Sequence, residues 1–188
     1  RIIETPNLDR LVRDGTSFLR ATCGNPICTP SRAEILTGCS SFLNGVLDFG
    51  RKIRPSLATW PRTMAEAGYH SWYVGKWHND GKPGTHGYSE SLGFYTGGGR
   101  QWYSPQVDWK GMEVTGYRNW LFQDETGRKF PEKGVGLTPD ISARFADSAI
   151  DFIRRKTDKP FFLHVNFTAP HDPLLIPTGY EDKYNPAK

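Results

Sequence analysis

The sequence is short of several features that would point to common classes of function. It has only three cysteines and no Cys-x-x-Cys pair of the kind that holds zinc or forms a redox dithiol. No apolar run approaches the roughly 20 residues that cross a bilayer, so no membrane segment is expected. No repeat, low-complexity tract or secretory signal is visible, and because the first residue is Arg1 we expect that an upstream segment was removed or left out.

Charge is also not concentrated anywhere along the chain. Basic residues exceed acidic ones by 24 to 20, which gives a net charge of +4 and a pI near 9.0. The densest basic run, residues 154–156, falls in the last turns of a predicted helix, where cations suit the helix dipole. We therefore expect no nucleic-acid partner. Mild basicity instead suits an enzyme whose substrates are anions.

The apolar pattern that is present predicts a layered fold. Hydrophobic residues make up 37% and charged residues 23% of the chain, which permits a buried core. The patterns predict helices between Thr5 and Gly15, over residues 30–36, up to residue 67, and over residues 138–156, with strands over residues 16–21, 70–74 and 161–167. Helices that alternate with apolar strands favour an α/β fold with a mostly parallel sheet.

Residues 79–136 differ from the rest of the chain. They are rich in glycine, tryptophan, tyrosine and proline and show weak periodicity, which predicts a loop-rich insertion with at most a short hairpin. Such loops often carry function, so we expect this one to line a substrate cleft. Its aromatic side chains either stack on sugar rings or pack in the core, and both readings stay open: Trp102, Tyr103, Trp109, Tyr117 and Trp120.

The segment Cys28-Thr29-Pro30-Ser31-Arg32 combines a nucleophile with an anion-binding environment. Pro30 suits the first turn of a helix, which places Cys28 at or just before the helix N-terminus. Free backbone N–H groups at that position attract anions such as sulfate or phosphate. Arg32 lies four residues on, projects from the same face, and carries a planar fork that binds oxyanions. The alternative is an ordinary helix start with an incidental thiol.

Two further segments place titratable groups where strands end. In an extended chain Lys76 and His78 face the same side, at the end of a strand where open α/β sheets bind ligands. His171 follows the strand over residues 161–167, and the prolines at positions 170 and 173 stiffen its loop. In isolation, a Lys-x-His pair is more usual at a solvated strand end. The other histidines and cysteines are expected to have no part in chemistry: His164 within a strand, His70 and His86 at the surface, and Cys23 and Cys39 as buried or free thiols.

Taken in order, these segments resemble a known family. The first matches the pattern C-x-P-S-R-x4-T-G, the second runs Gly68-Tyr69 to Gly75-Lys76-Trp77-His78, and the third carries Pro170-His171. Both signatures and the later histidine are similar to those of the type I sulfatases. The resemblance implies an alkaline-phosphatase-like layered fold, a mostly parallel central sheet flanked by helices. It also implies that residues 1–188 are part of one catalytic domain and lack its first strand and its C-terminal portion.

The resemblance assigns a role to each residue. Cys28 would be converted to formylglycine, whose hydrated form attacks the sulfur of a sulfate ester. His78 would deprotonate the second hydroxyl, so that sulfate leaves and the aldehyde returns. Arg32 would orient the hydrated group, Lys76 would bind a sulfate oxygen, and His171 would protonate or stabilise the leaving alcohol.

The resemblance also implies a cofactor, partners and a location. One Ca²⁺ ion would polarise the sulfate, bound by formylglycine at position 28 and by carboxylate and amide ligands outside this chain. The partners would be a sulfated small molecule or carbohydrate and the formylglycine-generating enzyme, in a periplasmic, secreted or lysosomal setting. Two alternatives stay open: a phosphonate or phosphate ester hydrolase of the same superfamily, and a non-catalytic homologue that only binds anions.

Overall fold

The computed structural model describes residues 3–94, 106–107, 113–114, 121–135, 138–171 and 180. The elements follow in this order: α1 (Pro6–Asp14), α2 (Cys28–Thr37), α3 (Ser41–Asn44), α4 (Trp60–Glu66), β1 (His70–Lys76), the 3₁₀ helix η1 (Pro83–His86), β2 (Glu90–Phe94), β3 (Gln106–Val107), β4 (Glu113–Val114), β5 (Leu121–Asp124), β6 (Lys129–Val135), α5 (Ile141–Ile153) and β7 (Phe161–Asn166). None of the helices in these ranges is long and apolar enough to cross a membrane.

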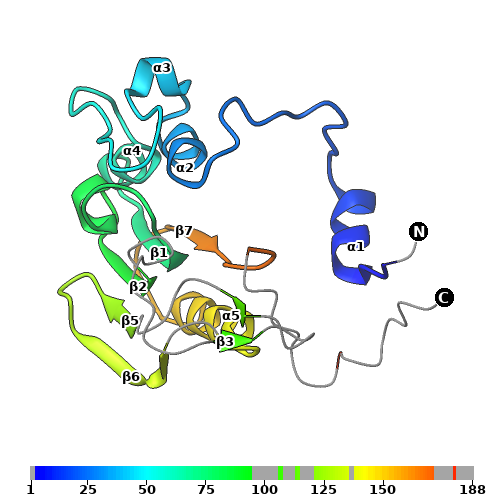
Figure 1. Ribbon diagram of the computed structural model, residues 1–188. Coiled ribbons are helices and arrows are strands. Elements are labelled where there is room, and N and C mark those ends of the chain that lie inside the picture. The colour runs from blue at the N-terminus through cyan, green and yellow to red at the C-terminus, as the bar shows by residue number, and fades with distance from the viewer. Residues whose placement is uncertain are drawn as a thin grey trace.

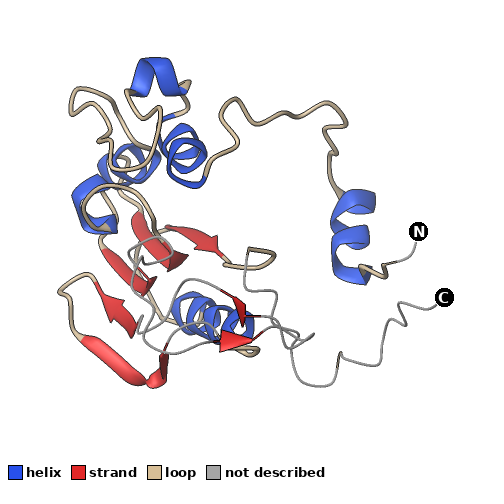
Figure 2. Ribbon diagram, viewed as in Figure 1, coloured by secondary structure: helices blue, strands red, loops and turns tan. Residues whose placement is uncertain are grey.

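A five-stranded sheet forms the middle layer, in the order β6-β5-β2-β1-β7. Its centre is parallel, because β1 pairs in parallel with both β2 and β7, while β5 and β6 extend it as antiparallel strands. Helices α2 and α4 cover one face and α5 the other, whereas α1 lies apart from these layers (Figures 1 and 2). The predicted layered α/β fold with parallel strands at its centre is confirmed.

Two hydrophobic clusters, one on each face, hold the layers together. Strand β1 supplies both, since Trp72 and Val74 face α5 while Tyr73 faces α2, as the alternation of a strand requires. The cluster under α5 comprises Trp72, Val74, Phe94, Phe122, Ile141, Phe145, Ala149 and Phe152. The cluster under α2 comprises Ala33, Leu36, Val46, Ile53, Tyr73, Trp77 and Tyr88. Because both of its faces are covered, β1 is buried from Ser71 to Lys76.

Two of the expected features differ from the structure. The strand expected over residues 16–21 is wrong: the segment is irregular, and Phe18 and Leu19 are 81% and 94% exposed. Its backbone has no neighbouring strand among the described residues, and an extended segment needs such a partner to satisfy its N–H and C=O groups. Residues 79–136 are more than a loop-rich insertion, because β2, β5 and β6 join the main sheet. The aromatic residues expected to line a cleft lie outside the described residues, so that expectation stays a prediction.

The three parallel strands approach one another very closely where they end. Gly75 has φ of +112°, and a Cβ atom built on it would overlap with the backbone carbonyl of Asn166 on β7. A Cβ atom on Gly93 of β2 would in turn overlap with the backbone of Gly75. Glycine is therefore required here by space as well as by backbone conformation.

This close approach gives a first prediction. Gly75→Ala is expected to reduce the free energy of unfolding by about 1–3 kcal/mol more than Gly68→Ala, because it adds a backbone clash to the cost of the left-handed conformation. Gly68 is a matched control, since its φ is +88° and a Cβ atom there meets nothing within 4 Å. Urea unfolding of the complete protein, followed by tryptophan fluorescence, measures both. Equal losses would show that the strand ends have room to spread.

Candidate active site

Cys28 is the first residue of α2, and the segment before it is tied down. Ile27, the N-cap residue, is extended, with φ of −114° and ψ of 145°. Asn25 donates a side-chain hydrogen bond of 3.2 Å to the carbonyl of Leu47. The Glu34 carboxylate accepts hydrogen bonds from the backbone N–H and the hydroxyl of Ser41, both 2.9 Å. The half-buried Cys28 thiol forms no disulfide and lies at a helix N-terminus, as predicted.

His171 reaches the same place from the other end of the chain. Its Nε2 atom lies 3.8 Å from the Cys28 sulfur, although the two residues are 143 positions apart. The backbone N–H of His171 donates to the Thr168 carbonyl at 2.9 Å, so the chain turns immediately after β7. Since β1 and β7 are parallel neighbours, their carboxyl ends meet at one edge of the sheet. Both strands therefore direct their following residues toward Cys28.

Arg32 does not point freely into this space. Its Nη1 atom donates a hydrogen bond of 2.8 Å to the backbone carbonyl of Lys76, at the end of β1. That carbonyl also accepts a hydrogen bond from the Tyr73 hydroxyl. The Arg32 guanidinium thus connects helix α2 to strand β1 beside the thiol.

Lys76 brings a second cation to the site. Its side chain is 1% exposed, and burial lowers its pKa to about 8, with the nearby Arg32 charge acting in the same direction and Cys28 opposing it. Below this pKa the ammonium group remains charged, so at pH 7 most of the Lys76 population carries a positive charge. A buried ammonium beside a guanidinium is suited to bind an anionic ligand.

A turn after β1, and not the alternation of side chains along the strand, places His78 at the site. Strand β1 ends at Lys76, the next side chain, Trp77, enters the core, and His78 has a left-handed φ of +51°. The expectation that Lys76 and His78 face the same side because they lie two apart in one extended strand is therefore wrong. Burial, together with the charges of Lys76, Arg32 and His171, lowers the His78 pKa to about 4. The imidazole is neutral at pH 7 and able to accept a proton.

The ring of His78 is held on two sides. It stacks on Phe49 with a centroid distance of 5.5 Å and an interplanar angle of 18°. Its Nδ1 atom is buried and makes no hydrogen bond with the part of the chain that the structure describes. A buried imidazole nitrogen of this kind is usually reserved for a ligand or for water.

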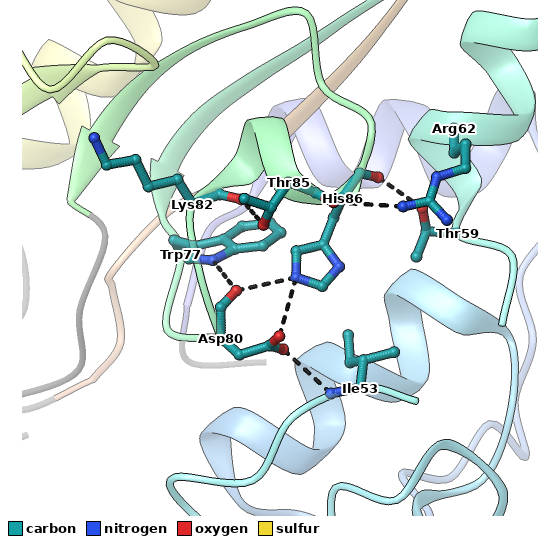
Figure 3. A network of polar contacts seen from close by, with 8 residues as sticks. All are labelled: Ile53, Thr59, Arg62, Trp77, Asp80, Lys82, Thr85 and His86. Carbon is teal, nitrogen blue, oxygen red and sulfur yellow. Dashed lines mark hydrogen bonds and ion pairs between the residues drawn. The ribbon is translucent and has the colours of Figure 1, made fainter. Parts of the chain in front are cut away.

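Asp80 organises the loop that carries His78 (Figure 3). Its backbone carbonyl accepts a hydrogen bond from Trp77 Nε1 at 3.3 Å and lies 3.0 Å from Nε2 of His86. Its carboxylate lies 3.5 Å from the same imidazole nitrogen and accepts the backbone N–H of Ile53 at 3.3 Å. The expectation that His86 lies at the surface is wrong, because the ring is 7% exposed and packs against Trp77. No motif indicated this cluster, since its members meet only in the folded chain.

The described residues make an anion site and not a calcium site. The groups around Cys28 are two cations and two imidazoles, Arg32, Lys76, His78 and His171. Within the described ranges, no three His, Cys, Asp or Glu side chains form a group able to hold a metal ion. Calcium takes 6–8 oxygen ligands, so it does not fit these residues by themselves.

All five residues singled out from the sequence therefore meet at one edge of the sheet. His164 is half-buried under the same face, where its Nδ1 atom lies 2.6 Å from the Tyr88 hydroxyl, which agrees with a structural position. The arrangement can bind a tetrahedral anion next to the residue at position 28. The neutral His78 can take a proton there, and His171 can exchange one with a group bound beside it.

Comparison with known proteins decides the family. The family model for sulfatases matches residues 1–188, which is the whole of the sequence. This chain belongs to the sulfatase family. The N-acetylgalactosamine-6-sulfatase of Canis lupus familiaris is 30% identical over 189 residues, which are 91% of this chain and 36% of that protein.

Two solved structures give the same TM-score with this chain. The structure of BT4656 with its substrate D-glucosamine-2-N,6-O-disulfate gives a TM-score of 0.69 at 28% identity, covering 91% of this chain and 30% of that one. The phosphonate monoester hydrolase SpPMH from Silicibacter pomeroyi also gives 0.69, at 21% identity, covering 100% and 40%, which is a likeness of fold. The sulfatase chain described here spans about a third of the length of such relatives.

Proposed function

We propose that the protein hydrolyses sulfate esters, with formylglycine made from Cys28 as its nucleophile. The observation that carries this proposal is the position of the Cys28 sulfur, at the N-terminus of α2 and 3.8 Å from His171. Arg32 and Lys76 supply the positive charge that a sulfate group needs, on the same side of the sheet. The thiol is half-buried and in no disulfide, so position 28 is compatible with the modification.

The residues of this chain divide the reaction between them. Formylglycine, when present and hydrated, supplies a hydroxyl nucleophile for attack on sulfur. Lys76 and Arg32 bind the sulfate oxygens and stabilise their negative charge, while new charge develops on the departing alcohol oxygen as the ester bond breaks. His171 donates a proton to the departing alcohol oxygen, and the neutral His78 accepts one from the second hydroxyl at position 28, so that sulfate leaves and the aldehyde returns. Calcium would need oxygen ligands from outside the described residues, and no step is derived through it.

A sulfated carbohydrate is the proposed substrate class. Two similar proteins act on or bind sulfated amino sugars, according to their names: N-acetylgalactosamine-6-sulfatase and BT4656 with glucosamine disulfate. The formylglycine-generating enzyme would be the partner during maturation. The proposed setting is periplasmic, secreted or lysosomal, as the family resemblance implies.

Phosphonate ester hydrolysis is the second candidate, because a phosphonate monoester hydrolase has the same fold over this region. Sulfate and phosphonate are both tetrahedral anions, so Arg32 and Lys76 suit either of them.

Two measurements on the complete protein test the proposal. Mass spectrometry of the peptide that contains Cys28 is expected to find the aldehyde in place of the thiol. Parallel rates with an aryl sulfate, N-acetylglucosamine 6-sulfate and a phosphonate monoester are expected to favour the sulfates. An unmodified thiol with no turnover would support a non-catalytic anion-binding homologue, and faster phosphonate turnover would support the second candidate.

A further inference from the structure

Tyr73 lies directly beneath the candidate active site and is completely buried. It is the middle residue of β1, on the face that α2 covers. Its ring makes edge contacts with Trp77 and Tyr88, both at centroid distances of 5.1 Å, and with His164 at 5.4 Å. The ring is therefore fixed in one orientation, and its hydroxyl group extends toward the carboxyl end of the strand.

The Tyr73 hydroxyl joins three elements that carry site residues. It donates its one proton to the backbone carbonyl of Lys76, which also accepts the 2.8 Å hydrogen bond from Arg32. Its oxygen accepts a hydrogen bond of 2.7 Å from Nδ2 of Asn166, at the end of β7, and a further one from Arg32. One oxygen atom thus links helix α2, the end of β1 and the end of β7.

This arrangement leaves the hydroxyl no alternative orientation. Burial raises the pKa of Tyr73 well above its usual value, so the group stays protonated throughout the range in which proteins are folded. The hydroxyl donates its proton to the Lys76 carbonyl, and its oxygen accepts hydrogen bonds from other groups. It therefore determines where that carbonyl lies, and the carbonyl in turn accepts the hydrogen bond of Arg32. A displacement of about 1 Å in such a site can cost 10²-fold in rate.

We propose that Tyr73 is a positioning residue, which holds Arg32 and Lys76 at the spacing that a bound sulfate group requires. The inference rests on the function proposed above. Asn166 supports it from β7 by restraining the hydroxyl. Neither residue touches the reacting atoms, so both act through the two cations.

Tyr88 provides a matched control for the experiment. It belongs to the same hydrophobic cluster, is also buried, and also uses its hydroxyl for one short hydrogen bond. That bond is made with Nδ1 of His164, at 2.6 Å, and not with Arg32 or Lys76. Removing the Tyr88 hydroxyl costs one buried hydrogen bond, about 1 kcal/mol in stability, whereas removing the Tyr73 hydroxyl costs three and is the change that loosens the cations.

The test compares Tyr73→Phe, Tyr88→Phe and Asn166→Ala in the complete protein. We expect Tyr73→Phe to lower kcat/KM for an aryl sulfate by about 10–100-fold and to weaken the affinity for inorganic sulfate, measured by calorimetry, about tenfold. Asn166→Ala, which loosens the hydroxyl without removing it, is expected to lose less in both. Tyr88→Phe is expected to keep its rate and sulfate affinity within about threefold although it also loses thermal stability through one buried hydrogen bond.

The two readouts separate this inference from the function on which it rests. If the unchanged protein turns over neither sulfate nor phosphonate esters, the proposed reaction fails, and the sulfate affinities alone decide about Tyr73. A weaker affinity in Tyr73→Phe but not in Tyr88→Phe supports the positioning role. Equal effects of the two variants, an unchanged Tyr73→Phe, or no sulfate binding by the unchanged protein would each overturn it.

Discussion

Replacing Cys28 with alanine is expected to abolish the hydrolysis of sulfate esters by the complete protein. The side chain at this position lies at the N-terminus of α2 and beside His171, so it is the one that reaches a group bound by Arg32 and Lys76. An alanine methyl group offers neither a nucleophile nor a thiol that can be converted to one. Because the side chain is half-buried and in no disulfide, the fold is expected to tolerate the change.

Cys23→Ala is the control for this experiment. Cys23 is exposed, and its thiol only donates a 3.4 Å hydrogen bond to the Asn25 carbonyl, so its removal is expected to leave the rate unchanged. Cys28→Ser should also fail in a host whose modifying enzyme accepts only cysteine. Initial rates with an aryl sulfate measure all three variants. Turnover by Cys28→Ala close to that of the unchanged protein would refute the proposed nucleophile.

The parts of the site that were predictable from the sequence are local ones. The helix that begins near Cys28 and the two apolar strands follow from short patterns, and Lys76, His78 and His171 lie within a few residues of strand ends. A parallel pairing of those strands then brings the groups together whatever the detailed packing. The turn that delivers His78, with its left-handed backbone, is not encoded in the spacing of Lys76 and His78.

The supporting residues were not predictable, because their partners are distant in the sequence. Tyr73 receives its hydrogen bond from a residue 93 positions away, and Asp80 meets Ile53 across 27 positions. A buried tyrosine in an apolar strand looks like any core residue until its hydroxyl is placed. His86 was expected at the surface for the same reason, since only the folded loop brings it to Asp80.

The strands within residues 79–136 were missed although Phe94 and Phe122 contribute to the core, because these strands are short and glycine interrupts their pattern. In β2, Gly93 packs against Gly75 of the neighbouring strand, a close contact that involves no apolar side chain. Hydrophobic periodicity cannot detect such an approach, and glycine ordinarily lowers the expectation of a strand. Strand β5 then pairs with β2 in antiparallel fashion, and β6 pairs with β5, as the short turn around Gly127 permits.

Lys76→Ala is expected to reduce kcat/KM by at least 10²–10³-fold, the usual cost of removing a preorganised group that stabilises developing charge. The ammonium group is 1% exposed and shares its surroundings with Arg32, so its loss removes charge at the point where a sulfate oxygen would lie. The cavity that alanine leaves at this buried position is expected to cost some stability, which urea unfolding measures separately from the rate.

His78→Ala and His171→Ala are expected to lose at least as much, because each removes a proton-transfer group that contributes 10²–10⁴-fold. The low pKa of His78, about 4, keeps its imidazole neutral at pH 7, the form that accepts a proton. His70→Ala is the control: this histidine begins the same strand, stacks on Trp72 at 5.7 Å, and lies six residues before Lys76 at the opposite end of β1. Initial rates with an aryl sulfate, beside urea unfolding, measure all the variants. A larger loss of rate in His70→Ala than in His78→Ala, at equal stability, would place the chemistry at the amino end of β1 and refute the site described here.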